Sequence, residues 1–413
     1  MRILVLGLNY APEEIGIGPY TTGLSQGLAR AGHSVRVIAG HPYYPQWQVP
    51  AGYGGLWQRT IEHDVTVTRC PHYVPTDPSG LKRLVHHATF AVSAAGPMLA
   101  AALRFRPDIV FTVAPSLAAA PLAVIASKLT GALNWLHVQD FEVEAAFATG
   151  LLRQDTTLGT LAARLERGIF RSFDRVSSIS PEMCAKLEQS GVDPGRIVEF
   201  RNWADIAGIR PLTGESSYRK EWAITTPHVA LYSGNIANKQ GIELVIEAAI
   251  RLRTRNDLTF VVCGQGPNRA RIEAQAKEAG LQNIRFHDLQ PRERLGDLLG
   301  LATVHLLPQL ADAADLVLPS KLANMLASGR PVLTTAMPGT GLAREVEGCG
   351  RVVPPGDINA FARALEQLID DAPQRRRLGV VARHRAENVW DYNAILNRLI
   401  PAFSNARSRK QLA

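Results

Sequence analysis

The sequence predicts an α/β protein made of two Rossmann-like domains, with parallel sheets that face each other across a cleft. The chain has 413 residues, of which 46% are hydrophobic and 20% charged, which indicates a globular protein too long for one ordinary core. Short apolar runs alternate with helical stretches, which is typical of βαβ units and a parallel sheet. The alternation stops at a polar segment and then restarts, which indicates a second domain.

The first domain is expected to span residues 1–205. Its strand candidates are short apolar runs separated by helical stretches. They lie at residues 2–8, 34–40, 65–70, 108–114, 132–140, 175–180 and 196–202. The helical stretch at 20–32 ends at Gly32, as expected because glycine often follows the last turn of a helix.

The second domain is expected to span residues 227–385. Its strand candidates lie at residues 228–235, 258–266, 283–289, 304–309 and 331–336. Helical patterns such as 241–255 separate them, so this sheet is also expected to be parallel. The segment 206–226 between the domains is polar and contains Pro211 and Gly214, which is typical of a linker.

The composition indicates which partners are excluded and which cellular compartment is expected. The net charge is +8, but the arginines are scattered without aromatic residues between them, so no nucleic-acid partner is expected. The four cysteines lie far apart and favour neither a disulfide framework nor a zinc site, which fits a cytoplasmic setting. No signal peptide is expected, and the apolar stretch 88–103 is shorter than the ~20 residues that span a bilayer.

Two loops of the second domain follow strand candidates and suit a phosphate group. Ligands of open parallel sheets bind at the carboxyl ends of the strands. The first loop, in LYSGNIANKQG, offers polar side chains, a flexible backbone and a compact positive charge that can reach a diphosphate. Its candidate residues are Ser233, Gly234, Asn235 and Lys239. The second loop carries Gly264 and Gly266, which let a base or a phosphate approach closely; an ordinary tight turn is the alternative.

A third loop begins the helix in DLVLPSKLANMLASG. Lys321 stands at the helix N-terminus, where a positive charge opposes the helix dipole, so an anionic ligand would explain it. Ser320 can cap the same helix. The candidate ligand contacts of this loop are Asp315, Ser320, Lys321 and Asn324.

Two loops of the first domain are also candidates. Gly16 and Gly18 precede a helix and would let backbone N–H groups approach an anion, although an ordinary turn explains them as well. His137 and Asp140 end a central strand, and the imidazole could hydrogen-bond hydroxyls of a sugar or an acceptor. The alternative is an acid-rich helix start, because Glu142 and Glu144 follow.

Together these loops predict a site for a nucleoside diphosphate. No metal-ligand cluster occurs at a recognisable spacing. We therefore expect lysines and helix N-termini to balance the diphosphate charge, without a metal and without a cofactor.

Several motifs resemble one family along nearly the whole chain. They are GxNYxPExxGIGxYT at 7–21, HxQDxEV at 137–143, LYSGNIxxKQGxE at 231–243 and ADxVLPSKLxNxLASG at 314–329. The chain resembles the GT-B retaining glycosyltransferases of family four, and within them the fucosyltransferase-like enzymes of colanic acid and exopolysaccharide biosynthesis.

The resemblance implies how such an enzyme would work. The second domain would bind a GDP- or UDP-linked sugar, and the first would bind a polyprenyl-diphosphate-linked saccharide. Transfer would retain the anomeric configuration without a metal. Lys239 would bind the diphosphate, Gly16 and Gly18 would lie near it, and His137 would lie near the reacting sugar. The final segment 386–413 would be a helix that returns to the first domain.

The chain departs from the family pattern at two places. Asn235 stands where arginine is common, which removes a fixed positive charge. Leu316 and Asn324 stand where a pair of glutamates is usual, with Asp315 beside the first position. Ser320 and Lys321 are the residues that we expect to take over contacts with the ligand.

Other functions fit the same scaffold. One is a sugar-nucleotide epimerase or hydrolase, which would need acid and base carboxylates such as Asp140, Glu142 and Glu144. Another is a non-catalytic binding subunit that resembles a transferase. The basic and apolar stretch at 81–87 could also contact the inner face of an anionic cytoplasmic membrane, or be an ordinary surface helix.

Overall fold

The computed structural model describes residues 1–148, 153, 155–204, 206–237, 240–310, 318–319 and 321–412. Within these residues the chain divides into two compact units. One contains Met1–Arg201 with Leu396–Ala413, and the other contains Asn202–Ile395. Each unit is built around its own sheet, as the predicted fold class requires.

The sheet of the first unit has the strand order β3-β4-β2-β1-β5-β6-β7-β8. Its strands pair in parallel except for β3, which runs antiparallel to β4 at the edge. Strand β3 was not predicted, because its side chains are largely exposed and form no apolar run. The bounds are β1 (Arg2–Gly7), β2 (Ser34–Gly40), β3 (Gln58–Glu62), β4 (Val65–Cys70), β5 (Ile109–Ala114), β6 (Leu133–Val138), β7 (Arg175–Ser178) and β8 (Ile197–Glu199).

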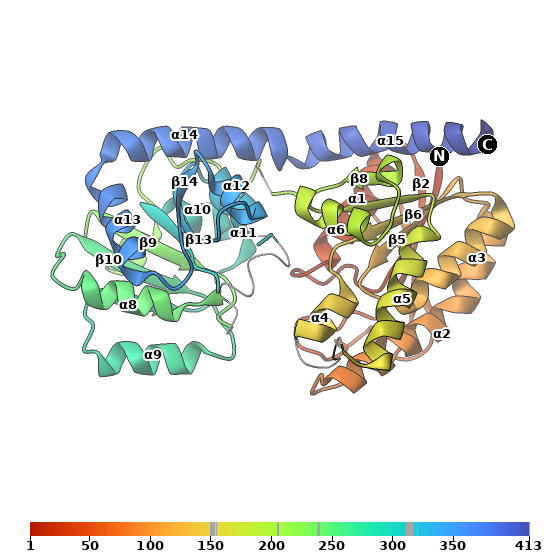
Figure 1. The fold of residues 1–413 in the computed structure, drawn as a ribbon, viewed down its shortest axis with the longest axis horizontal. Coiled ribbons are helices and arrows are strands. Elements are labelled where there is room, and N and C mark those ends of the chain that lie inside the picture. The colour runs from red at the N-terminus through yellow and green to blue at the C-terminus, as the bar shows by residue number, and fades with distance from the viewer. Residues whose placement is uncertain are drawn as a thin grey trace. The chain divides into compact units, whose positions relative to one another are not determined.

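Helices cover both faces of this sheet. Figure 1 shows α15 on one side of it and α2 with α3 on the other. The central strands β5 and β6 are therefore buried along their whole length, as expected for a covered parallel sheet. The bounds are α1 (Gly18–Arg30), α2 (Gly80–Phe105), the 3-10 helix Leu117–Ala119, α3 (Ala120–Thr130), α4 (Glu142–Ala148), α5 (Thr157–Arg171), α6 (Pro181–Gln189), the 3-10 helix Pro194–Arg196 and α15 (Tyr392–Leu412).

Helix α2 is long and apolar enough to cross a membrane by length and composition alone. Within the unit one of its faces is buried, through Phe90, Ala94, Met98 and Ala102. The opposite face carries exposed apolar side chains, so α2 is amphipathic within the fold.

The sheet of the second unit has the strand order β11-β10-β9-β12-β13-β14, and its strands pair in parallel. The last strand, β14, was not predicted, because it is short and only its end is buried. The bounds are β9 (His228–Ser233), β10 (Leu258–Cys263), β11 (Ile284–His287), β12 (Val304–Leu307), β13 (Val332–Thr335) and β14 (Gly350–Val353).

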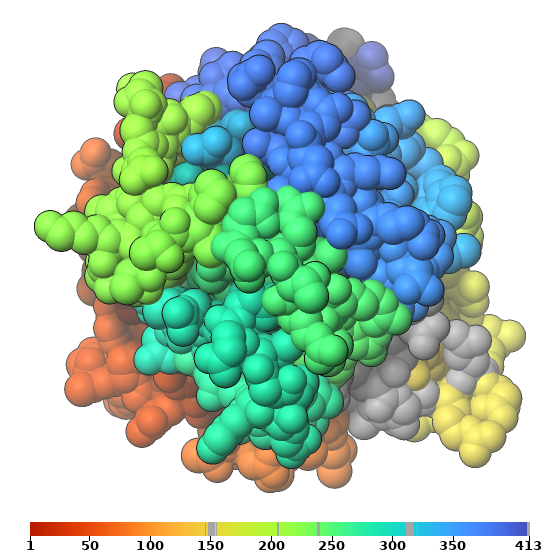
Figure 2. Space-filling model, turned by 90° about the vertical axis from the view of Figure 1, so that its left-hand side faces the viewer, coloured from red at the N-terminus to blue at the C-terminus, as the bar shows by residue number. Residues whose placement is uncertain are grey.

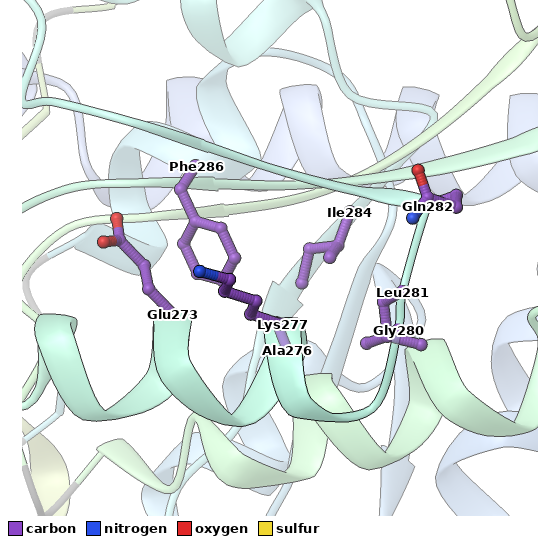
Figure 3. A pocket seen from close by; sticks show the side chains of 8 residues that line it. All are labelled: Glu273, Ala276, Lys277, Gly280, Leu281, Gln282, Ile284 and Phe286. Carbon is purple, nitrogen blue, oxygen red and sulfur yellow. The ribbon is translucent and has the colours of Figure 1, made fainter.

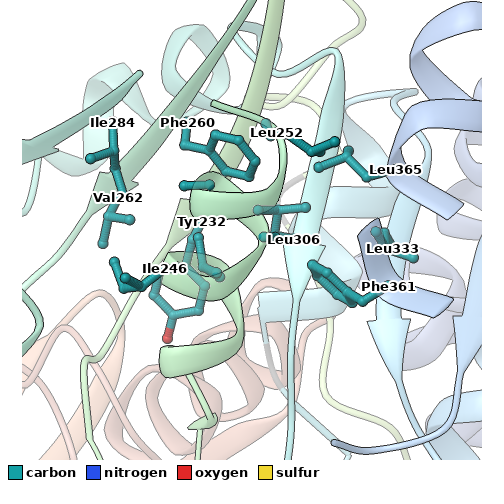
Figure 4. Close-up of a cluster of buried hydrophobic side chains, with 14 of the residues drawn as sticks. Tyr232, Ile246, Leu252, Phe260, Val262, Ile284, Leu306, Leu333, Phe361 and Leu365 are labelled. Carbon is teal, nitrogen blue, oxygen red and sulfur yellow. The ribbon is translucent and has the colours of Figure 1, made fainter. Parts of the chain in front are cut away.

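The core of the second unit lies between this sheet and its helices. Figure 4 shows its apolar centre, where Tyr232 and Phe260 of the sheet meet Ile246 of α8 and Phe361 of α13. The outer surface in Figure 2 is formed in part by the sides of α8, α9, α13 and α14 that face away from this core. The bounds are α7 (Tyr218–Glu221), α8 (Glu243–Arg251), α9 (Arg269–Glu278), the 3-10 helix Arg292–Arg294, α10 (Leu295–Gly300), α11 (Lys321–Ala327), α12 (Gly341–Val346), α13 (Ile358–Asp370) and α14 (Ala372–Val389).

The described part of the segment expected to be a linker, 206–226, packs into the second unit. Ile209 and Tyr218 are buried in apolar clusters of that unit. Arg383 of α14 also donates a 2.6 Å hydrogen bond from Nη1 to the carbonyl of Ile209. The polar composition predicts a linker, and burial of its few apolar side chains holds the described part against the second unit.

The last helix attaches to the first unit. Phe403 of α15 packs edge-on against the ring of Trp135 at 4.9 Å between centroids. Arg407 forms an ion pair with Asp108, and Lys410 forms one with Asp174. Most of α15 therefore belongs to the first unit, although it follows directly from the second unit in the sequence.

Candidate functional site

The carboxyl ends of β9 and β10 bring two glycine-containing loops into backbone contact. A Cβ atom on Gly264 would lie 1.9 Å from the carbonyl oxygen of Gly234. Gly266 has a φ of +154°, and a Cβ atom there would lie 2.4 Å from the carbonyl oxygen of Ile236. Close backbone packing thus requires glycine at both positions. A contact of Gly264 or Gly266 with a base or a phosphate remains a prediction.

Lys321 is the most unusual side chain at this edge of the sheet. Its Nζ atom is buried, and no described residue accepts a hydrogen bond from it. It lies 3.9 Å from the centroid of the Tyr232 ring, and a Cβ atom on Gly234 would be 3.6 Å from it. Burial lowers the pKa of Lys321 to about 7. A buried ammonium group without a partner is costly, and an anion at this point would offset that cost.

The ring of Tyr232 packs against the ammonium group of Lys321. The side chain is fully buried, and its hydroxyl group donates a hydrogen bond to the carbonyl of Asn235. Burial raises the pKa of Tyr232, so the phenol stays neutral. The same ring therefore fixes the loop after β9 and offers its face to the ammonium group of Lys321.

Of the other residues predicted for this site, some lie among the described residues and some lie outside them. Ser233 is buried at the end of β9, Asn235 is exposed, and Asn324 lies half-buried one helical turn after Lys321. The structure thus brings Ser233, Gly234, Asn235 and Lys321 to one edge, with Asn324 on the same helix as Lys321. Lys239, Asp315 and Ser320 lie outside the described residues.

In the first unit, Gly16 and Gly18 are required by close packing. Gly16 has a φ of +75°, and a Cβ atom there would lie 3.0 Å from the ring of Tyr44. A Cβ atom on Gly18 would lie 2.8 Å from the Cβ atom of Glu13. The predicted approach of an anion to these glycines stays a prediction, because packing alone accounts for both.

Glu13 is a buried carboxylate that was not predicted as a site residue. Its Oε1 atom accepts hydrogen bonds from the backbone N–H groups of Tyr43 and Tyr44, both at 3.0 Å. Its Oε2 atom accepts one from Asn9 at 2.9 Å. Burial raises the pKa of Glu13. Glu13 thus ties the loop after β1 to the loop after β2, and its place in the GxNYxPE part of the 7–21 motif is the sequence signal that points to it.

His137 lies inside the first unit and not on an open strand end. It is 2% exposed, and its ring packs against Phe200 and Phe111 with centroids 4.7 and 6.0 Å away. Its Nδ1 atom lies 3.0 Å from Ser177 Oγ, while Nε2 has no partner among the described residues. Burial lowers the pKa of His137 to about 3, so the imidazole is neutral near pH 7.

The carboxylates that follow His137 in the sequence form hydrogen bonds and an ion pair within the first unit. Asp140 accepts a hydrogen bond from the N–H of Phe141 at 2.9 Å. Glu142 accepts one from the N–H of Leu117 at 2.6 Å, and Glu144 forms an ion pair with Lys186 at 2.8 Å. These contacts leave little freedom for the acid and base roles that an epimerase or hydrolase would require.

Glu166 of α5 was not anticipated from the sequence. It accepts a hydrogen bond from the N–H of Val143, and burial together with the neighbouring carboxylates raises the pKa of Glu166 to about 7. No local motif marks it, because α5 reaches the α4 segment only through the fold.

A surface hollow lies elsewhere in the second unit. Figure 3 shows it between α9 and the edge strand β11, lined by Glu273, Lys277, Ile284 and Phe286 among others. It contains none of the predicted site residues. The described residues also contain no group of three or more His, Cys, Asp or Glu side chains placed to hold a metal ion.

Comparisons with known proteins show the family of the chain. The family described as "Glycosyl transferases group 1" matches residues 215–385, and the family "Glycosyl transferase 4-like domain" matches residues 16–203. WcaI from Escherichia coli (strain K12), which is named as a colanic acid biosynthesis glycosyl transferase, is 40% identical over 408 residues, covering 97% of this chain and 99% of WcaI. The chain belongs to the GT-B glycosyltransferases.

Solved structures support the fold of this glycosyltransferase. Sucrose-phosphate synthase from Thermosynechococcus elongatus matches with a TM-score of 0.75 at 16% identity, over 99% of each chain. HepE from Anabaena, solved in complex with UDP, matches with a TM-score of 0.71 at 15% identity, over 98% of this chain and all of HepE. The glycosyltransferase therefore has the predicted α/β architecture, and its two family matches fall on the two units.

Proposed function

We propose that this glycosyltransferase moves a sugar from a GDP- or UDP-linked donor to a polyprenyl-diphosphate-linked saccharide during exopolysaccharide biosynthesis of the colanic acid type. The similarity to WcaI supports the pathway class. The complexes of HepE with UDP and with UDP-glucose support a nucleotide-sugar donor, because they share this fold.

The observation that carries the proposal is the buried Nζ atom of Lys321. It lies at the carboxyl end of β9, where ligands of parallel sheets bind, and no described residue pairs with it. A diphosphate oxygen at this position would restore a charge-assisted hydrogen bond. Binding would also raise the pKa of Lys321, so that the ammonium form is held while the diphosphate leaves.

The proposed reaction retains the anomeric configuration by attack on the front face of the donor sugar. The bond between the anomeric carbon and the diphosphate oxygen breaks as the acceptor hydroxyl forms the new glycosidic bond on the same face. The departing diphosphate oxygen takes the hydroxyl proton. Lys321, and Lys239 as predicted from the sequence, stabilise the negative charge that develops on the leaving group, so the step needs no metal.

His137 and Asp140 have supporting roles in this proposal. The neutral His137 ring can hydrogen-bond a sugar hydroxyl through Nε2, which has no partner among the described residues. Asp140 belongs to the turn that follows β6 and helps to orient the acceptor. No carboxylate nucleophile takes part in this proposal, because Glu142 and Glu144 are engaged in the fold.

The test is a transfer assay with purified protein. The protein is incubated with a panel of GDP- and UDP-sugars and a polyprenyl-diphosphate-linked saccharide, with and without EDTA. We expect a new glycosidic bond with the donor's anomeric configuration, seen by NMR, at a rate that EDTA leaves unchanged. Epimerised donor without transfer, or nucleotide binding without turnover, would point to the rival functions.

We also propose that the cytoplasmic enzyme docks on an anionic membrane through the start of α2. Leu81, Leu84 and Val85 are exposed there, beside the basic Lys82 and Arg83. Exposed apolar and basic side chains on one helix are typical of interfacial helices. We expect flotation with vesicles that contain phosphatidylglycerol and little flotation with phosphatidylcholine alone. Equal recovery with both, or none with either, would refute this docking.

A further inference from the structure

Three polar side chains that have no role in the proposed transfer meet at the carboxyl ends of β1, β2 and β4. Tyr10 lies shortly after β1, His41 directly follows β2, and Arg69 is the last residue but one of β4. They are 1%, 3% and 1% exposed, respectively. We refer to these three residues as the Arg69 cluster.

The members of the Arg69 cluster lie close to one another. The guanidinium carbon of Arg69 is 5.8 Å from the centroid of the Tyr10 ring. Burial raises the pKa of Tyr10 and lowers the pKa of His41, and the positive charge of Arg69 acts on both rings as well, because both lie near it. The cluster therefore forms one polar group within the first unit.

Most polar atoms of the Arg69 cluster have no hydrogen-bond partner. Arg69 uses Nη2 for Glu62, at 2.9 and 3.2 Å, but its Nε and Nη1 atoms bond to no described residue. The same holds for the Tyr10 hydroxyl, while the His41 ring bonds to no described side chain and has the backbone of Gly55 beside it. Buried polar groups are nearly always hydrogen-bonded in proteins, so several unpaired groups in one place require an explanation.

A surface loop at residues 51–57 covers the Arg69 cluster. The ring of Tyr53 lies 4.9 Å from the guanidinium carbon of Arg69. The backbone of Gly55 is close enough to His41 to act on the pKa of its ring. The rest of the loop is largely exposed, and Trp57 pins its end to α2 by a 2.9 Å hydrogen bond to the carbonyl of Ser93. Movement of this loop would open the cluster to a ligand.

The chemistry of the Arg69 cluster fits hydroxyl groups better than an anion. Glu62 already balances the charge of Arg69, and the buried Glu13 lies within electrostatic range of it. The unpaired groups combine donors on Arg69 with Tyr10 and His41, which can both donate and accept. Aromatic faces beside mixed donors and acceptors suit a saccharide, whose hydroxyls do both.

We propose that Tyr10, His41 and Arg69 form a binding site for the hydroxyl groups of a saccharide, reached when the 51–57 loop opens. The inference rests on the proposed function in taking this saccharide as part of the acceptor. The three residues would then decide which acceptor sugar is accepted, because a site built to bond a hydroxyl strongly rejects an analogue without it.

Tyr10→Phe is the decisive variant, since it removes only the unpaired hydroxyl. If that hydroxyl is merely buried, its loss leaves the midpoint of thermal unfolding unchanged or raises it. If it binds a saccharide, affinity falls while the fold is kept. Tyr73→Phe, at an exposed position of the same unit, is the matched control.

The probes are the methyl glycosides of glucose, galactose, mannose and fucose, with glucuronate and inorganic pyrophosphate as anionic probes. Binding to the full chain is measured by saturation-transfer NMR. We expect at least one neutral glycoside to bind, about fivefold or more weakly to Tyr10→Phe than to the wild type and to Tyr73→Phe. Equal binding to all three proteins, no bound glycoside, or binding of an anionic probe alone would overturn the proposal.

Thermal shifts with UDP and GDP separate this inference from the proposed function. Tyr10→Phe should be stabilised by nucleotide as much as the wild type is. If neither nucleotide stabilises any of the proteins while a glycoside binds as expected, the donor proposal fails and the Arg69 cluster stands.

Discussion

The Nζ atom of Lys321 lies 3.9 Å from the centroid of the Tyr232 ring and has no hydrogen-bond partner among the described residues. The ring face offsets only part of the cost of burying the charge, about 1–2 kcal/mol. Removing an ammonium group from water costs several kcal/mol even after the protein relaxes. The pair is therefore a cation site that is stabilised fully only when an anion binds.

Lys321→Ala should abolish most of the transfer activity and leave the fold intact. The variant loses the charge that faces the leaving diphosphate, so we expect kcat to fall by about 10²–10³, in line with the loss of a preorganised electrostatic group. Circular dichroism should be unchanged. Lys277→Ala, at an exposed position of α9, is the control and should retain full activity. Near-normal kinetics for Lys321→Ala would remove this lysine from the site.

The stability of the nucleotide-free protein should rise with pH above 7 because of Lys321. Its folded pKa is about 7, well below the value of about 10.4 in an unfolded chain. Between these values the unfolded state holds the extra proton, so the free energy of unfolding increases by up to about 1.4 kcal/mol per pH unit from this group.

Urea unfolding of the wild type and of Lys321→Met at pH 7, 8 and 9 measures that increase. The wild type should gain stability relative to Lys321→Met across this range. Parallel curves for the two proteins would mean that the folded pKa of Lys321 is not depressed.

Gly264→Ala should destabilise the second unit. The added Cβ atom would lie 1.9 Å from the carbonyl oxygen of Gly234, which is backbone and cannot rotate away. We expect a loss of about 3 kcal/mol or more in the free energy of unfolding. Gly214→Ala has nothing within 4 Å of the new Cβ atom and serves as the control, expected to lie within about 0.5 kcal/mol of the wild type. Equal stabilities would show that the two loops separate easily.

The sequence predicts the α/β architecture well because its buried strands are continuous apolar runs. It predicts edge elements poorly, since β3 and β14 bury few side chains and so lack that pattern. The average composition of the 206–226 segment is polar, so it does not show that a few apolar residues such as Tyr218 pack into the second unit.

The sequence also indicates which loops matter, but not which side chains are buried together. Lys321 is predicted as a site residue because its charge opposes a helix dipole, while its pairing with Tyr232 depends on two segments that are distant in the sequence. Arg69 and Glu166 carry no local motif, Glu13 lies within the motif at 7–21, and only tertiary packing reveals the unusual environments of all three. The sequence predicts that Gly16 and Gly264 let a ligand approach, and the structure shows that close packing also requires glycine at both positions, which a sequence cannot show.

His137→Phe should separate a contact with substrate from a role in packing. Phenylalanine can occupy the space between Phe111 and Phe200, and Ser177 keeps its 2.8 Å hydrogen bond from Trp135 Nε1. We therefore expect a loss of at most about 1–2 kcal/mol in stability. If His137 Nε2 bonds the sugar, kcat should still fall by about 10²-fold or more. An unchanged kcat would limit His137 to packing.

The pH dependence of the rate tests the protonation state of His137. Because burial holds its pKa at about 3, the ring stays neutral between pH 5 and 8 and contributes no inflection to the rate profile in that range. The profile of the wild type should thus be the same in shape as that of His137→Phe, at a higher rate. An inflection near pH 6.5 that disappears in the variant would mean that the imidazole is protonated in the working enzyme, and that it acts as an acid or base instead of a neutral hydrogen-bond donor.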